Sequence, residues 1–92
     1  MAGLIRSEYK PAMTRYFFNL YECGRATIDE EGLLLATVPE AHHRAIEEAR
    51  AIMCAEVREG RLCLSCNIEV VDAAGSLAVN VRFADALALS GA

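Results

Sequence analysis

One stretch of the chain, residues 37–59, carries the signals of an amphipathic helix and limits the folds open to the rest. Thr37 can cap its first turn, Glu40 completes a Thr-x-x-Glu capping box, and Pro39 is tolerated at this position. Gly60 is a typical residue to end the helix. Apolar side chains recur along one stripe at helical spacing, at Ala41, Ala45, Ile46, Ala49, Ile52, Met53 and Val57. A helix with one apolar stripe covers one face of a sheet, so we expect the flanking residues to supply that sheet.

The segment before this helix predicts a strand over residues 15–22. Four of the six aromatic residues lie in it, and aromatic side chains favour strands. Alternation assigns its side chains to two faces, with Tyr16, Phe18 and Leu20 on one and Phe17, Asn19 and Tyr21 on the other. Two short extended pieces are expected at residues 26–29 and 33–36, separated by a turn.

The segment after the helix predicts a hairpin. Residues 62–71 form its first strand, with Ile68 and Val70 facing inward, and the turn at residues 72–75 uses Gly75 for its positive φ. Residues 77–83 form the second strand, in which Leu77, Val79, Val81 and Phe83 alternate with Ala78, Asn80 and Arg82. A helical turn is expected within residues 84–89.

Together these elements predict an α+β fold of ββαββ order, an antiparallel three- to four-stranded sheet with one helix packed on one face. Residues 1–12 lack periodicity and are expected to be a flexible N-terminal tail or a start-site extension. Residues 13–92 are expected to form a single domain.

Composition narrows the classes of function. The 92 residues include nine Lys and Arg against thirteen Asp and Glu, a formal net charge of −4, and no basic run, so a nucleic-acid partner is not expected. No segment predicts a membrane helix or a signal peptide, which makes a cytoplasmic location the default and free thiols the expected state of the four cysteines.

The cysteines are the first candidate for chemistry. Cys63 and Cys66 have Cys-x-x-Cys spacing, with Cys23 and Cys54 elsewhere, so structural zinc and a redox pair are alternatives. Residues three apart in an ideal strand point to opposite faces, however, and residues 62–71 are predicted as a strand. We therefore expect the cysteines to act as small apolar side chains, with no metal and no cofactor.

Two other clusters have functional and structural interpretations. By helical phase His42 lies within the apolar stripe and His43 at its edge, so the two rings point in different directions and cannot both face one metal ion. A metal ligand and a pH-sensitive interface are the functional alternatives, but we expect partly buried histidines at the helix start. Residues 29–32, Asp-Glu-Glu-Gly, could bind a divalent cation, but we expect a solvated turn because no second acidic cluster completes a site. No catalytic residues are predicted, and the chain is not expected to be an enzyme.

The aromatic strand suggests self-association. One helix shields one sheet face only, and residues 15–22 carry aromatic side chains on both faces. Stacked rings could also bind single-stranded nucleic acid, but few cations accompany them. We expect a homodimer built on the sheet, with a dimer or partner surface formed by Phe17, Asn19, Tyr21 and Val71. The predicted function is a non-enzymatic interaction or regulatory domain with a protein partner.

The residues that carry this pattern also resemble a family. Residues 15–18 (Arg-Tyr-Phe-Phe), 29–32, the Ala-rich helix, 68–70 with Asp72 and Gly75, and 81–86 are similar to a small alphaproteobacterial domain of unknown function, over roughly residues 13–89. The resemblance implies a scaffold without an established activity and no catalytic residues to carry over. In layout the chain also resembles HicB-type antitoxins, although its cysteine positions do not match them. That second likeness implies an alternative function, a regulator that binds a toxin protein or nucleic acid.

Overall fold

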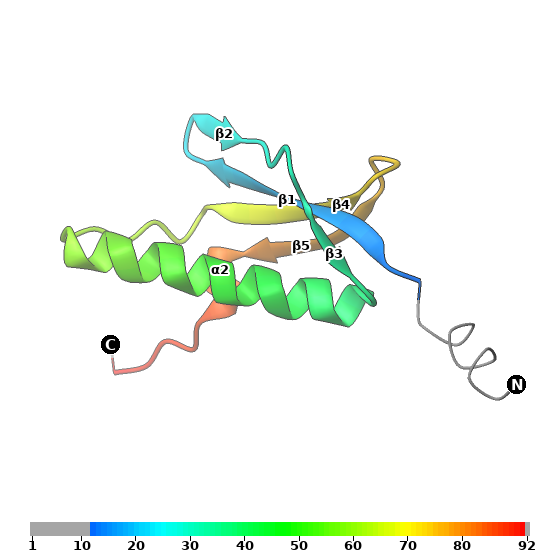
Figure 1. Cartoon of the computed structure of the whole chain (residues 1–92). Coiled ribbons are helices and arrows are strands. Elements are labelled where there is room, and N and C mark those ends of the chain that lie inside the picture. Colours follow the sequence, from blue (N-terminus) through cyan, green and yellow to red (C-terminus); the bar gives the residue numbers. More distant parts are fainter. Residues whose placement is uncertain (1–11, 92) are drawn as a thin grey trace, which may run out of the picture.

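A computed structural model describes residues 12–91 of the chain (Figure 1). The expectation of a tail or extension at residues 1–12 therefore falls almost wholly outside the described residues. The described part is an α+β unit in which one long helix packs against an antiparallel sheet, as predicted. Within residues 12–91, no helix combines the length and hydrophobicity of a membrane span.

The helix α2 (Val38–Arg58) forms as its sequence signals predict. The Thr37 side chain accepts a hydrogen bond from the backbone N–H of Glu40 at 3.2 Å, and the Glu40 carboxylate accepts from the Thr37 N–H at 3.3 Å. This reciprocal capping box satisfies backbone donors at the helix start that have no partner within the helix. Gly60, which follows the C-cap, has φ of 84°.

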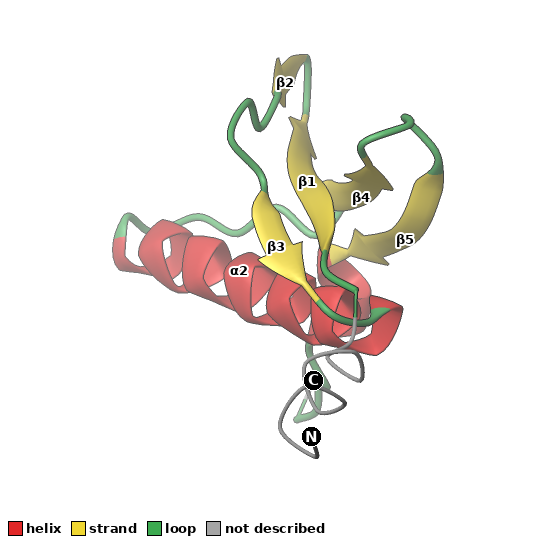
Figure 2. Cartoon of the chain, turned by 45° about the vertical axis from the view of Figure 1, so that its right-hand side comes forward, coloured by secondary structure: helices red, strands yellow, loops and turns green. Residues whose placement is uncertain are grey.

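The sheet has five strands because its edge strand is divided into two pieces. The central strand β1 (Thr14–Glu22) pairs along one side with β4 (Asn67–Asp72), which pairs with β5 (Leu77–Arg82). Along its other side β1 pairs first with β3 (Leu33–Leu35) and then with β2 (Arg25–Thr27). The loop between these short strands spans residues 28–32, opposite three residues of β1, so it bulges from the sheet edge (Figure 2).

The core lies between α2 and one face of this sheet. The helix contributes three alanines to it, and their small side chains let the helix approach the strands closely. The helix-facing side of β1 is Tyr16, Phe18 and Leu20, as predicted. The buried apolar side chains are Tyr16, Ala41, Ala45, Ala49, Met53, Cys66, Ile68, Val70, Val81, Phe83 and Ala86. The short 3₁₀ helix η1 (Phe83–Ala86), in the region where a helical turn was predicted, closes the core beneath α2.

The last turn of α2 departs from the predicted stripe. Val57 is 59% exposed, whereas Glu56 is 7% exposed. Figure 1 shows the reason, since the C-terminal end of α2 extends past the start of β4 and faces the connecting segment instead of the sheet. The Glu56 carboxylate accepts a hydrogen bond from the Cys63 backbone N–H at 3.3 Å, which compensates its burial.

Two strand predictions also need correction. The strand predicted at residues 62–71 starts only at Asn67, and residues 61–66 form an irregular connection. Leu77 was expected to continue the alternation of Val79 and Val81, but it is 58% exposed. A bulge between Val70 and Val71 pairs Leu77 with Val71 and moves its side chain to the other face of the sheet.

The β4–β5 turn forms as predicted. Gly75 has φ of 83°, and its N–H donates to the Asp72 carbonyl at 2.9 Å. The Asp72 carboxylate accepts from the N–H groups of Ala74 and Ser76, each at 2.9 Å. This side chain therefore supplies the hydrogen bonds that hold the turn.

Candidate functional site

The first candidate site is the face of the sheet turned away from α2, here called the open face. Figures 1 and 2 show the helix on the opposite side only. Phe17 pairs with Val71, and Val71 pairs with Leu77, so an apolar row crosses β1, β4 and β5. Leu34 of β3 pairs with Arg15 on the same face and is 45% exposed. Phe17 and Val71 are partly buried and Leu77 is 58% exposed, so the row is open to a partner mainly at its β5 end.

The predicted partner surface maps onto this face, with one difference. Phe17, Tyr21 and Val71 are all partly buried and lie on the open side of their strands. Asn19 is only 8% exposed, because its side-chain oxygen accepts a hydrogen bond from the Asp29 N–H at 2.9 Å. Asn19 therefore holds the bulged loop. The exposed part of the open face is completed by Leu34 and Leu77, neither of which was predicted to belong to this surface.

The acidic segment 29–32 has a structural role, because Asp29 joins the loop between β2 and β3 to β1. One Asp29 oxygen accepts from the Phe18 N–H at 3.1 Å, and the other accepts from the N–H groups of Glu31 and Gly32, each at 3.1 Å. The loop is thereby fixed to the edge of β1. The interpretation of this segment as a solvated turn holds for Glu30 and Glu31, which are exposed, but not for Asp29.

These contacts change the acidity of Asp29. Burial alone would raise the pKa of the carboxyl, but the backbone N–H groups of Gly32, Phe18 and Glu31 outweigh it and hold the pKa below its ordinary value of 3.8. The unfolded chain therefore takes up this proton first as the pH falls. The contribution of Asp29 to the free energy of unfolding is fully present above pH 3.8 and is lost as the pH falls through the lowered pKa.

Replacing Asp29 with asparagine is expected to destabilise the chain. The amide keeps one acceptor oxygen and presents an N–H₂ group where the other oxygen stood, so a backbone donor loses its partner, at a cost of roughly 1–3 kcal/mol. Urea unfolding at neutral pH and near pH 3 measures both effects: the variant is less stable at neutral pH and loses less stability on acidification. Glu30→Gln is the control, because Glu30 accepts none of these three bonds. Equal acid sensitivity in D29N and the parent chain contradicts the assignment.

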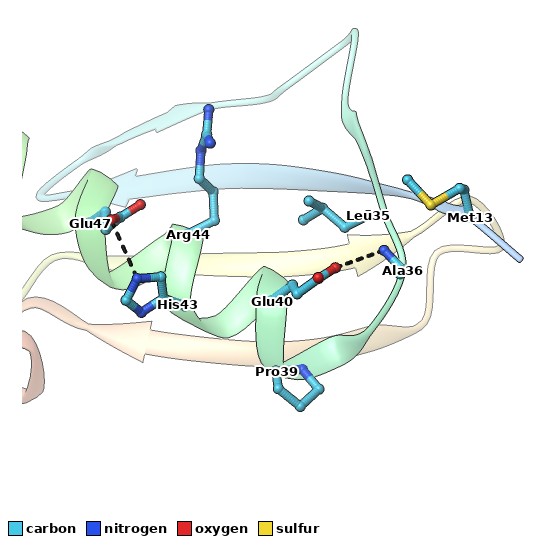
Figure 3. A pocket seen from close by; sticks show the side chains of 8 residues that line it. All are labelled: Met13, Leu35, Ala36, Pro39, Glu40, His43, Arg44 and Glu47. Atoms are coloured by element: carbon cyan, nitrogen blue, oxygen red, sulfur yellow. Dashed lines mark hydrogen bonds and ion pairs between the residues drawn. The ribbon is translucent and has the colours of Figure 1, made fainter. Parts of the chain in front are cut away.

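A pocket of about 620 Å³ lies where β3 meets the start of α2 (Figure 3). Three of its polar side chains, Glu40, His43 and Glu47, already have partners within the chain. Glu40 accepts from the Ala36 N–H at 2.9 Å as part of the helix cap, and His43 pairs with Glu47 at 3.4 Å. Both histidines are exposed, so the prediction of partly buried rings is wrong; at this end of α2 the buried positions are Ala41 and Ala45. Among residues 12–91, no three His, Cys, Asp or Glu side chains are placed to hold a metal ion.

The second candidate site is formed by Cys23, Cys63 and Cys66, here called the thiol cluster. Cys63 Sγ lies 3.0 Å from Cys66 Sγ and 3.9 Å from Cys23 Sγ. The Ser65 hydroxyl lies 3.3 Å from Cys63 Sγ and 3.6 Å from Cys23 Sγ. Cys54 is exposed on α2, as its helical phase predicts, and is the remaining free cysteine.

This convergence contradicts the prediction that Cys63 and Cys66 point apart. The prediction assumed an extended strand, but the connection before β4 bends at residues 64–65 and brings the two sulfurs within 3.0 Å of each other. The Cys66 carbonyl then accepts from the Phe83 N–H at 2.9 Å, which anchors the end of this connection to η1. Cys-x-x-Cys spacing three residues after the helix-ending Gly60 was the available sequence signal. The approach of Cys23 had none, because it depends on the pairing of β1 with β4.

Cys63 and Cys66 differ in pKa. Hydrogen bonds from the Cys66 thiol and from the Ser65 hydroxyl and backbone lower the pKa of Cys63 to about 7. Burial and the adjacent Cys63 raise the pKa of Cys66 to about 12. The pair therefore holds one readily ionised thiol beside one that keeps its proton.

Comparison with known proteins gives a family. The model of the family described as Domain of unknown function (DUF6894) matches residues 15–84. This span contains both candidate sites and ends just after β5. No curated protein and no solved structure matches the chain.

Proposed function

Because the chain belongs to DUF6894, a family of domains of unknown function, its activity has to be argued from its own surfaces, and we propose that it is a non-enzymatic interaction domain that pairs with a second copy of itself through the open face. The observation that carries this proposal is the apolar row Phe17–Val71–Leu77, which is in register across three strands and lies on the side without the helix. Burying such a row removes apolar area from water without changing the fold.

A second copy suits this face for two reasons. The row runs across the strands, so a two-fold axis that lies in the interface, parallel to the plane of the sheet, can stack it on the same row of the partner, as in a self-complementary interface. The surrounding side chains include Arg15 and Arg82 and also Glu69, so both signs of charge are present for pairing between copies. The chain is also short, and a core rich in alanine offers limited apolar burial within one copy.

We propose the cytoplasm as the place where the domain works. The four cysteines are all free in the structure, and free thiols persist in reducing compartments. The non-enzymatic part of the proposal is supported by the first pocket, whose Glu40 and His43 are already engaged within the chain.

Leu77→Lys is expected to convert a dimer into a monomer. Leu77 is 58% exposed and makes up the end of the apolar row, so a charge there opposes pairing without disturbing the core. Light scattering after size-exclusion chromatography should give twice the 10.0 kDa chain mass for the parent and the single chain mass for the variant. Val57→Lys is the matched control, because Val57 is 59% exposed but lies on α2. A monomeric parent, or a variant that stays dimeric, overturns the proposal.

A further inference from the structure

The thiol cluster brings together two segments that are distant in the sequence. Cys23 lies in the turn after β1, while Cys63 and Cys66 lie in the connection between α2 and β4. Cys63 is the common neighbour, within 3.0 Å of one sulfur and 3.9 Å of the other. A structural role in the core explains Cys66, which is 2% exposed, but not Cys63, which is only partly buried.

Cys63 is also open to a small reagent. A pocket of about 290 Å³ borders the cluster and is lined by Glu22, Cys23, Arg25, Glu56, Arg61, Cys63 and Cys66. Its charged groups already have partners. Arg25 pairs with Glu22 at 3.4 Å, and Arg61 pairs with Glu59, which lies outside the lining, at 2.9 Å. Glu56 accepts from the Cys63 N–H at 3.3 Å. The pocket is therefore too small for a large substrate, and its charged side chains are already engaged. It suits a small neutral oxidant.

We propose that Cys63 and Cys66 form a reversible dithiol–disulfide site in which a hydroperoxide oxidises Cys63 and Cys66 closes the disulfide. The two sulfurs need to approach from 3.0 Å to a bond length of about 2.05 Å. The bend at residues 64–65 already places them close to each other. Cys66 is nearer to Cys63 than Cys23 is, so it is the resolving thiol.

The chemistry balances with hydrogen peroxide as the oxidant. The Cys63 thiolate attacks one peroxide oxygen, the O–O bond breaks, and hydroxide leaves, so that Cys63 becomes a sulfenic acid. Cys66 gives its proton to that hydroxide and attacks the Cys63 sulfur; the S–O bond breaks, and the second hydroxide leaves and takes up the proton that Cys63 released when it ionised. In total two thiols and one peroxide give one disulfide and two waters, and two electrons pass from the sulfurs to the oxygens. A small thiol returns the site to the dithiol by exchange, and is itself oxidised to its disulfide.

The electrostatics of the cluster support these roles. The lowered pKa of Cys63 provides thiolate near neutral pH, which is the form that attacks. The raised pKa of Cys66 keeps its proton in place until the sulfenic acid has formed. The carboxylates that face the pair are Glu22 from β1 and Glu56 from α2, and Arg25 and Arg61 lie at the pocket rim. The nearby charges are thus of both signs; the short contacts to Cys66 and Ser65 set the pKa of Cys63, and burial is the largest effect on the pKa of Cys66.

Peptide mapping after oxidation tests the proposal. The full chain is treated with one equivalent of hydrogen peroxide, alkylated, and digested with trypsin. Cleavage after Arg61 and Arg82 keeps Cys63 and Cys66 in one peptide, 62–82, while Cys23 and Cys54 fall in peptides 16–25 and 51–58. The expected product is peptide 62–82 lighter by two hydrogens and unalkylated, and dithiothreitol restores both alkylation sites. A cross-link between peptides 16–25 and 62–82, or Cys54 oxidised before peptide 62–82, overturns the assignment.

Matched variants separate the roles of the thiols. Cys63→Ser is expected to abolish the oxidised peptide, and Cys54→Ser to leave its yield unchanged. Cys66→Ala, which keeps a small apolar side chain in the core, should leave a sulfenic acid at residue 63 that dimedone traps. Because the variants could differ in folding, circular dichroism accompanies each. Neither C63S nor C66A can form the disulfide within peptide 62–82, since each lacks one of its two sulfurs. The deciding measurement is therefore the dimedone adduct at residue 63 of C66A, and its absence contradicts attack at Cys63.

A pH profile gives an independent measurement in the unmodified protein. Iodoacetamide alkylation of peptide 62–82 at Cys63 should reach half its maximal rate near pH 7, matching the lowered pKa of about 7. A midpoint near the ordinary value of 9.0 contradicts the proposed nucleophile. The thiol cluster contains no residue of the apolar row, so peptide 62–82 of L77K should be oxidised to the same extent as in the parent chain. The redox proposal and the dimer proposal can therefore fail independently.

Discussion

Gly32→Ala is expected to destabilise the chain by roughly 2–5 kcal/mol, the sum of a left-handed backbone strain and an overpacking cost. Gly32 has φ of 71°, a conformation that L side chains rarely adopt. A Cβ at this position would meet Arg15 Cγ at 2.8 Å, the Tyr16 carbonyl oxygen at 2.9 Å and the Phe17 ring at 3.0 Å. The Tyr16 oxygen belongs to the backbone of the central strand, so it cannot move aside without disturbing the pairing of β1 with β3.

Chemical denaturation at one fixed chain concentration measures this loss, the concentration being held because pairing of copies also adds stability. Gly24→Ala is the matched control. Gly24 has φ of 70°, nearly the same as Gly32, but a Cβ there meets nothing within 4 Å. The control is expected to lose only about 1 kcal/mol, from backbone strain alone. Equal losses in the two variants would mean that close packing at Gly32 contributes nothing.

Phe83→Ala is expected to cost roughly 3–5 kcal/mol, because it leaves a cavity in the centre of the core. Phe83 is 0% exposed and is the largest fully buried side chain in the described part of the chain. It begins η1 and packs with the helix alanines, which are too small to fill the space it vacates. For a domain of this length such a loss approaches a large share of the total stability.

Denaturation followed by circular dichroism checks the Phe83 prediction, with Leu89→Ala as the control. Leu89 is 66% exposed and lies in the irregular C-terminal segment, so its truncation should change the free energy of unfolding by less than about 0.5 kcal/mol. A small loss in F83A would show that the core collapses around the missing ring. The Phe83 N–H bond to the Cys66 carbonyl uses backbone atoms and should persist in the variant.

The elements that local sequence determines were predicted well. Helix α2 has a cap, a stripe and a terminating glycine within its own residues, and it forms between them. The two faces of β1 follow from the alternation of its side chains. The turn at residues 72–75 is also determined locally, by the Asp72 side chain and by Gly75. In each case the interactions that decide the structure connect residues close in sequence.

The predictions that were wrong concern features that depend on contacts between residues far apart in the sequence. Leu77 changes face because of a bulge that exists only in the pairing of β4 with β5. Val57 is exposed because α2 extends past the sheet, and the relative lengths of helix and sheet appear in no single segment. The role of Asp29 depends on the Phe18 N–H, eleven residues away, which becomes available because the edge strand is interrupted.

The same division applies to the candidate sites. The sequence by itself determined an α+β fold in which the helix covers one face of the sheet. It also placed Phe17, Tyr21 and Val71 on the opposite face, because strand alternation and helical phase are local geometry. Only the tertiary structure decided that Asn19 is used internally, that Leu77 completes the apolar row, and that three cysteines from two distant segments converge. Those outcomes depend on strand register and on the path of the connection after α2, which are set by contacts between residues far apart in the chain.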